Sequence, residues 1–203
     1  MKRAKNIHVN NLLACALGLM AMALITSCND SKPDNKDGAC HIRGTISTRF
    51  NDVKIFLVPT VGPQDAAHVD SVHIKDGKFE FTKDTVGIYD LRLDFRYRRG
   101  IQQLIVVTEP GEVKVHIGQE SEAIGTPQND SLNEFKKMTE SRHKNFVLLK
   151  QRLDSLNIAK EARRDTIRKY QANVRADYAA FARRQPEGVL RDELIKRYPG
   201  KKN

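Results

Sequence analysis

The stretch VDSVHIKDGKFEFT, residues 69–82, indicates two short strands on either side of a tight turn. The dipeptide Asp76-Gly77 is strongly favoured in two-residue β-hairpin turns, which need backbone conformations that most residues avoid. After the turn, Phe79 and Phe81 alternate with charged residues, so one side of the strand is apolar and the other side is polar. We therefore expect an antiparallel hairpin with one buried face.

Short apolar runs of the same kind continue on both sides of this stretch. They end at turn residues such as Pro59, Arg99-Gly100 and Pro110-Gly111, and no helical pattern separates them. Roughly seven or eight strands at this spacing are typical of a sandwich or an open barrel, since parallel βαβ units need a helical crossover. Beyond the strand that starts at Cys40, we expect strands over residues 53–58, 69–74, 78–82, 88–98, 101–108 and 112–117.

The second half of the chain has the apolar spacing of amphipathic helices. Asn129, Asp130 or Ser131 can cap the first helix, and Pro186 ends the second. With a break within residues 157–165, two long helices form a hairpin, and a short helix follows over residues 190–198. The apolar stripes are Leu132, Phe135, Phe146, Leu149, Leu153 and Leu156, then Ile167, Tyr170, Val174, Tyr178 and Phe181. These stripes fit packing on each other or on the sandwich, and they also fit a coiled coil with another chain.

The N-terminus has the composition of a secretory leader, with basic residues at its start. Leu12 to Ile25 is an uncharged run of 14 residues, which is shorter than the roughly 20 that a spanning helix needs. Ile25-Thr26-Ser27-Cys28 resembles a bacterial lipobox, and this resemblance implies that Cys28 is acylated and becomes the first residue of the mature chain. An uncleaved anchor or a buried helix is the alternative.

These patterns divide the chain into four parts. We expect a lipoprotein signal peptide over residues 1–27, a flexible polar tether over 28–38, a β-sandwich over 39–127 and a basic helical region over 128–203. The predicted fold class is α+β, with an N-terminal antiparallel β-sandwich followed by a C-terminal helical hairpin and a short helix. The lipid would place the protein in the cell envelope, on the outer or the inner membrane, facing the periplasm or the surface.

Charge is distributed unevenly between the two halves. Residues 28–127 hold 13 Lys and Arg against 15 Asp and Glu, whereas residues 128–203 hold 19 against 10. A basic helical surface fits anionic lipid headgroups, and solvated helix faces with local ion pairs are the alternative. Nucleic acid is the other usual partner of basic charge, but an exported chain rarely meets it and no binding motif is present.

One cysteine is left once the leader and the lipid are taken into account. Cys15 leaves with the leader and Cys28 carries the lipid, so Cys40 has no partner for an internal disulfide. Free cysteines are strongly buried as a class, and we interpret Cys40 as a small apolar residue at the start of a strand. A reactive thiol at Cys40 is the alternative interpretation.

Several short motifs carry a resemblance in their order and spacing. They are Ile42-Arg43-Gly44, Asp70-Ser71, Asp76-Gly77-Lys78-Phe79-Glu80-Phe81, Glu109-Pro110-Gly111, Gly125-Thr126, Asn129-Asp130 and Leu132. Over about residues 38–140 the chain resembles the N-terminal domain of unknown function of thiol–disulfide oxidoreductase lipoproteins of Gram-negative bacteria. The resemblance implies a sandwich, a helical linker and a lipid anchor.

The residues that carry the chemistry of those lipoproteins are not found in this sequence. Their thioredoxin-like domain holds a Trp-Cys-x-x-Cys site, whereas this sequence has no Trp and no Cys-x-x-Cys. Thiol–disulfide exchange needs one thiol that attacks and a second that resolves. The oxidoreductase activity is therefore not carried over from the resemblance.

Arginines on the predicted strand over 88–98 form a candidate patch for an anionic ligand. Arg92, Arg96 and Arg98 alternate with apolar residues, and Arg99 follows at the turn. Such a patch can bind an anionic glycan, a lipid phosphate or an acidic partner. A solvated outer face of the sheet is the alternative.

Histidines and carboxylates indicate neither a metal site nor a hydrolase. His41, His73 and His116 lie on expected strands without a metal-binding spacing. Asp70 and Ser71 are neighbours on one strand and face opposite sides of its sheet, so they cannot form a triad with His73. We expect no metal and no cofactor.

Two functions follow from these observations, and an unrecognised enzyme is a third. The first is a non-catalytic envelope lipoprotein that binds or scaffolds an envelope protein or a glycan. The second is an accessory subunit for a separate thioredoxin-like oxidoreductase, acting through Cys40. The pattern does not predict an oligomeric state.

Overall fold

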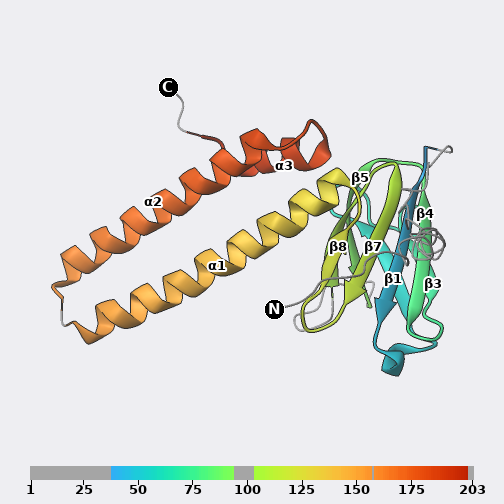
Figure 1. Ribbon diagram of the computed structural model, residues 1–203, viewed down its shortest axis with the longest axis horizontal. Helices are drawn as coiled ribbons and strands as arrows, with labels where there is room; N and C mark the ends of the chain where they lie inside the picture. The colour runs from blue at the N-terminus through green and yellow to red at the C-terminus, as the bar shows by residue number, and fades with distance from the viewer. Residues whose placement is uncertain (1–37, 94–102, 157, 201–203) are drawn as a thin grey trace, which may run out of the picture. The chain divides into compact units, whose positions relative to one another are not determined.

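The computed structural model describes residues 38–93, 103–156 and 158–200, and these form two β-sheets followed by three helices (Figure 1). One sheet contains, in order, β4 (Lys78–Lys83), β1 (Cys40–Ile46), β7 (Gly111–Ile117) and β8 (Glu122–Ile124). The other contains β3 (Asp70–His73), β2 (Lys54–Pro59), β5 (Gly87–Arg92) and β6 (Gln103–Thr108). The α+β fold predicted from the sequence is confirmed.

Neighbouring strands in the described sheets are antiparallel, with one exception. β1 and β7 run parallel, with Cys40 opposite Gly111 and Ile46 opposite Ile117. The alternation of apolar and polar residues in these two strands shows which side chains are buried, but it carries no information about which strand lies alongside. The sandwich is antiparallel as expected at every other described pair, and the expectation is corrected at this one.

The turn at Asp76-Gly77 forms, but its two arms do not make a hairpin. Both residues have positive φ, at 50° and 67°, and Lys75 and Lys78 exchange backbone hydrogen bonds of 3.0 and 2.8 Å. Beyond these two residues the arms separate, because β3 pairs with β2 and β4 pairs with β1. The turn therefore connects the two sheets at a corner, and the predicted hairpin is wrong beyond the turn itself.

The space between the sheets is filled by the apolar residues of the alternating strands. Ile42, Ile55, Leu57, Leu91 and Val113 are inaccessible to solvent there. Phe79 and Phe81 are also buried in this core, as the sequence pattern predicts, and their rings meet edge to face with centroids 6.2 Å apart. β5 ends at Arg92, six residues before the predicted end, and the remainder of that predicted strand lies outside the described residues, apart from Leu93.

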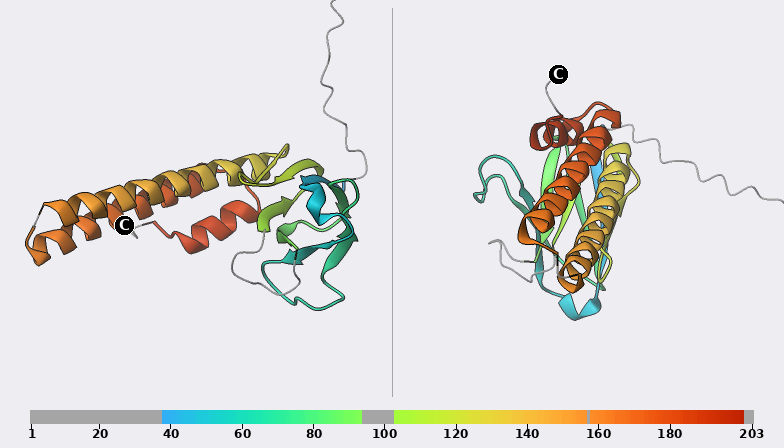
Figure 2. Two further views of the ribbon diagram at one scale, coloured as in Figure 1. Left: turned by 90° about the horizontal axis from the view of Figure 1, so that it is seen from below. Right: turned by 90° about the vertical axis from the view of Figure 1, so that its left-hand side faces the viewer.

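The three helices are α1 (Pro127–Ser155), α2 (Lys160–Arg184) and α3 (Val189–Arg197). α1 and α2 run side by side as a hairpin, and α3 contacts α2 and β5 (Figures 1 and 2). This agrees with the predicted hairpin, its break within 157–165 and the short third helix. None of the helices among the described residues combines the length and the hydropathy that crossing a bilayer would require.

A second apolar cluster joins the helices to the sandwich. Val107 on β6 packs with Phe181 and Ala182 of α2 and with Leu190 and Leu194 of α3, all of them buried. The sheet with β6 therefore buries residues on both of its faces: Val106 faces the core between the sheets, and Val107 faces the helices.

Candidate functional site

The start of α1 is fastened to β6 by a buried amide. Asn129 is fully buried; its Oδ1 accepts the backbone N–H of Val107 at 2.9 Å and its Nδ2 donates to the Val107 carbonyl at 2.7 Å. The same Nδ2 donates to the hydroxyl of Thr126 at 2.8 Å. The helix begins with Pro127 after Thr126, so Asn129 and Asp130 lie in its first turn, Ser131 lies just beyond it, and the predicted cap positions are wrong. The Asn129 side chain bonds β6 and the Thr126 hydroxyl, and it does not cap the backbone of α1.

A second amide extends this fastening to α3. The Glu109 carboxylate accepts a hydrogen bond from the Gln128 backbone N–H at 2.6 Å. It accepts another from the Gln128 side-chain amide at 3.0 Å. The other end of the Gln128 side chain accepts the backbone N–H of Leu190 at 3.0 Å. One chain of hydrogen bonds thus runs from the sandwich through α1 to the start of α3, and it positions the helices at the sheet.

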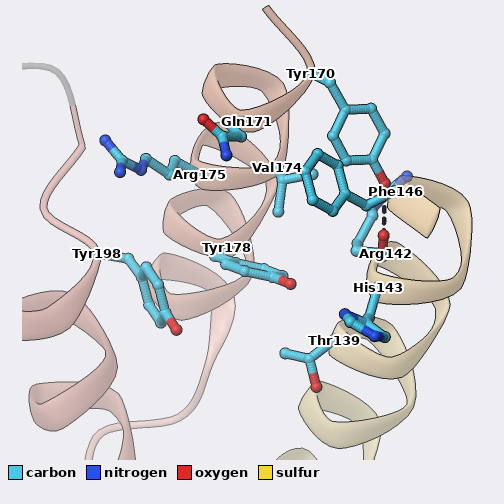
Figure 3. Close-up of a pocket in the computed structure, with 10 residues that line it drawn as sticks. All are labelled: Thr139, Arg142, His143, Phe146, Tyr170, Gln171, Val174, Arg175, Tyr178 and Tyr198. Atoms are coloured by element: carbon cyan, nitrogen blue, oxygen red, sulfur yellow. Dashed lines mark hydrogen bonds between the residues drawn. The ribbon is translucent and has the colours of Figure 1, made fainter. Parts of the chain in front are cut away.

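Further along the hairpin, α1 and α2 enclose an open groove. It has a volume of about 340 Å³, within the range of ligand-binding clefts. Its lining residues, drawn in Figure 3, are Thr139, Arg142, His143 and Phe146 on α1, Gln171, Val174, Arg175, Tyr170 and Tyr178 on α2, and Tyr198 after α3. We call this the hairpin groove.

Aromatic rings form the walls of the hairpin groove. Phe146 and Tyr170 stack across the two helices with centroids 5.7 Å apart, and Tyr178 meets Tyr198 edge to face at 5.0 Å. The Tyr170 hydroxyl donates to the Arg142 carbonyl at 2.7 Å, drawn as a dashed line in Figure 3. Partial burial, with a smaller effect from Tyr198, raises the pKa of Tyr178 above its usual value. These rings are only half-buried, so apolar surface stays open to a ligand.

Polar and basic side chains flank the rings on both helices. On α1, Arg142 is held by Asp177 of α2 at 2.7 Å, and His143 is exposed next to it. On α2, Arg175 is exposed and forms no ion pair with any residue of the described chain; in Figure 3 it extends on the side away from Phe146 and Tyr170. The groove therefore combines flat apolar surface with an uncompensated guanidinium, two features enriched where proteins bind partners.

The arginine patch expected from the sequence is only partly within the described residues. Arg92 ends β5 and is 4% exposed, with its guanidinium 3.4 Å from the side-chain oxygen of Gln64 and its Nε unpaired. The loop that carries Gln64 covers the Arg92 side chain, which the strand pattern alone would leave exposed to solvent. Arg96, Arg98 and Arg99 lie outside the described residues, so the patch stays a prediction.

Cys40 has a free thiol at the first position of β1 and is 1% exposed, as the interpretation of a buried apolar residue predicts. Burial raises the pKa of this thiol to about 11, with smaller opposing effects from the neighbouring Glu109. A thiol in this state is protonated at neutral pH and is a poor nucleophile.

The remaining candidates from the sequence are occupied by structural contacts. Asp70 pairs with Lys83 at 2.7 Å, and His73 Nδ1 lies 3.1 Å from the Asp52 carbonyl, so neither acts on Ser71. His116 contacts the hydroxyl of Thr45 at 3.0 Å. No group of His, Cys, Asp and Glu suited to a metal ion occurs among the residues that the structure describes. Cys28 and the predicted leader lie outside those residues.

Residues 40–132 match the family described as Domain of unknown function (DUF4369). This DUF4369 region starts at the first residue of β1 and ends six residues into α1, so it contains the sandwich, Glu109 and both fastening amides. The hairpin groove lies after it. No curated protein and no solved structure was found to match the chain. The match supports a domain of unknown function, and the association with oxidoreductase lipoproteins stays a prediction.

The sequence pattern alone does not reveal the hairpin groove, because its two apolar stripes fit helix packing or a coiled coil. One signal was available: three of the residues that line the groove, Tyr170, Tyr178 and Tyr198, are tyrosines, whose hydroxyls are seldom left in a dry interior without a partner.

Proposed function

We propose that this protein is a non-catalytic binding module of the cell envelope whose hairpin groove takes an acidic segment of another envelope protein. The observation that carries the proposal is the groove itself: half-buried aromatic rings line it together with Arg175, a cation that no acidic residue of the described chain neutralises. The DUF4369 sandwich acts as the platform, because its edge fastens the helices that form the groove.

Charge and ring geometry favour this occupant. An acidic side chain can pair with Arg175, while an apolar or aromatic residue of the same segment packs on Phe146 and Tyr178. The helical half of the chain is strongly basic, which steers acidic partners toward it. Tyrosine contributes contact area at such a surface with little loss of side-chain entropy, and arginine is enriched among the residues that dominate binding free energy.

Anchoring by lipid is part of the proposal, and it rests on the lipobox resemblance at Ile25-Thr26-Ser27-Cys28. Several acyl chains on Cys28 would hold the module firmly at a membrane, because each buried CH₂ contributes about 0.8 kcal/mol. Mass spectrometry of the protein purified from cells tests this part. An acylated Cys28 as the first residue supports it, and an intact Met1 or an unmodified Cys28 contradicts it.

Photo-cross-linking in intact cells tests the binding role. A photoreactive amino acid replaces Gln171, which is exposed and lines the groove, and in a control chain it replaces Asn173, which is exposed on the same helix and does not line it. We expect an adduct with one defined envelope protein from position 171 and none from position 173. Equal adducts from both positions, or none from position 171, contradict the proposal; an adduct with a glycan would change the class of partner.

The alternative of a redox accessory subunit finds little support in the described residues. It needs an accessible thiol, and Cys40 is buried with its pKa raised to about 11. If Cys40→Ser abolished the activity of a partner oxidoreductase in cells, this alternative would have to be preferred.

A further inference from the structure

The side of α1 that faces solvent carries an ordered pattern of cations and apolar residues. Lys144, Leu148, Arg152 and Leu156 follow one another at intervals of four residues, so they lie along one side of the helix and its C-terminal end. We call them the α1 stripe. Leu148 is 61% exposed and Leu156 is 55% exposed, and the cations between them are exposed as well. None of the four lines the hairpin groove.

Leu148 and Leu156 expose more than half of their surface although they lie among charged residues of the helix. The inner side of α1 already packs on α2 through Phe146 and Leu153, so the stripe is not the buried face of the hairpin. Val147, beside the stripe, is also exposed. Scattered single apolar residues on a surface are normal, but here three exposed apolar residues fall within ten residues of one helix end, and cations alternate with two of them.

The surrounding charge is positive and largely unpaired. Residues 141–169, the end of the hairpin remote from the sandwich, hold nine Lys and Arg against three Asp and Glu. Asp154, Glu161 and Asp165 are each taken by an arginine of α2. Within the described chain no ion pair involves the cations Lys144, Lys150, Arg152, Lys160 and Lys169.

We propose that the α1 stripe binds the surface of an anionic phospholipid bilayer, with Leu148 and Leu156 entering the interface and Lys144 and Arg152 pairing with lipid phosphates. Basic amphipathic helices bind membranes in this way, since the apolar face is buried at the boundary of headgroups and acyl chains and the cations remain at the headgroups. This surface is separate from the hairpin groove, so membrane contact leaves the groove accessible to a partner.

The chain has no Trp, so one introduced tryptophan reports on a single position. Asn145 is exposed beside the stripe, and Asn145→Trp in the full chain gives the probe; Gln171→Trp, in the groove, is the control. The proteins are reconstituted into vesicles of phosphatidylglycerol or of phosphatidylcholine. We expect a blue shift and quenching by brominated acyl chains at position 145 in phosphatidylglycerol only, and no change at position 171. Because the readout is local, it does not depend on how the N-terminus is anchored.

Three double substitutions in the Asn145→Trp chain, one of them a control, separate the role of the cations from the role of the leucines. Lys144→Gln with Arg152→Gln should lower the fraction of shifted tryptophan about tenfold at limiting lipid, given the attraction of each cation to anionic lipid. Lys54→Gln with Lys196→Gln removes the same charge from exposed positions on other elements and should change this fraction less than twofold. Leu148→Ser with Leu156→Ser should remove the shift.

Three results would overturn the proposal. They are an equal shift in phosphatidylcholine, an equal shift at positions 145 and 171, and equal effects of the two charge pairs. A blue shift produced by soluble polyglutamate without vesicles would assign the stripe to an acidic protein instead of a membrane.

Discussion

The side-chain amide of Asn129 bonds both backbone polar groups of Val107, with distances of 2.9 Å to its N–H and 2.7 Å to its carbonyl. Val107 lies on β6, the last strand of its sheet, and Asn129 therefore supplies the pair of bonds that a further strand would make. A single side chain thus satisfies both backbone polar groups of Val107 at this sheet edge, and it fixes the start of a 29-residue helix.

Asn129→Ala should lower the free energy of unfolding by about 2–4 kcal/mol, because it leaves the N–H and carbonyl of Val107 buried without partners. Urea denaturation followed by circular dichroism measures the change. Asn145→Ala, at an exposed position of the same helix, is the matched control and should cost less than about 0.5 kcal/mol. Similar losses in both variants would show that Asn129 does not fasten the helix.

Gly44→Ala should disrupt the sheet with β1, because a Cβ at Gly44 would lie 1.9 Å from the ring of Phe79 on the neighbouring strand. The ring is buried and cannot move without repacking, so we expect a loss of about 1–3 kcal/mol in the free energy of unfolding. A second variant, Gly44→Ala with Phe79→Leu, should recover part of the loss. If Gly44→Ala were neutral, the close packing of the ring on β1 would be disproved.

The apolar pattern within single segments was sufficient to predict most of the strands and both long helices. Alternation in 78–82 and 112–117 and the stripes of 132–156 and 167–181 depend on each segment alone, and the structure confirms those strands and both helices. The pairing partners depend on the whole chain, so the parallel β1–β7 pair and the separation of the two arms at Asp76-Gly77 were missed. β8 is only three residues long and carries little periodic signal.

Stability should fall as the pH rises from about 9 to about 11. The Cys40 thiol has an ordinary pKa of 9.0, which burial raises to about 11 in the folded protein. Between these values the unfolded chain binds fewer protons than the folded chain, so unfolding is favoured as pH increases. Well below pH 9 the thiol is protonated in both the folded and the unfolded chain, so it does not change the free energy of unfolding.

Urea midpoints at pH 8, 9.5 and 10.5 measure this effect, and Cys40→Ala should remove the part that Cys40 contributes. The native thiol should also react with a disulfide reagent only as fast as the protein opens. Rapid labelling at neutral pH without unfolding would contradict the burial of Cys40 and would support the redox alternative.

Tyr170→Phe should loosen the end of the hairpin and leave the sandwich intact. The Tyr170 hydroxyl bonds the Arg142 carbonyl across the two helices at 2.7 Å, and its loss should cost about 1 kcal/mol. Hydrogen exchange should become faster at amides of residues 142–156 and 160–174 and stay unchanged in β1 and β7. Unchanged exchange in the helices would show that this bond does not hold the hairpin together.

The candidate site was less predictable than the fold. The tyrosines and Arg175 were visible as a stripe and as charge, but a groove exists only once two helices lie side by side. Contacts between residues far apart in the chain, such as the Tyr170 hydroxyl with the Arg142 carbonyl, hold the helices there. At Arg92 the strand pattern predicts an exposed side chain, but the loop that carries Gln64 covers it.

The most direct test of the hairpin groove combines the cross-link from position 171 with reversal of one charge. Arg175 lines the groove, whereas Arg168 lies on the same helix, does not line it and is paired with Asp165 at 3.3 Å. The yield of the adduct is measured in cells after Arg175→Glu and after Arg168→Glu. We predict that the first substitution abolishes the adduct and that the second leaves it within about twofold of the parent, because attraction to an acidic segment becomes repulsion only at the groove. An adduct that survives Arg175→Glu, or that both substitutions reduce equally, would contradict the proposed binding of an acidic segment there.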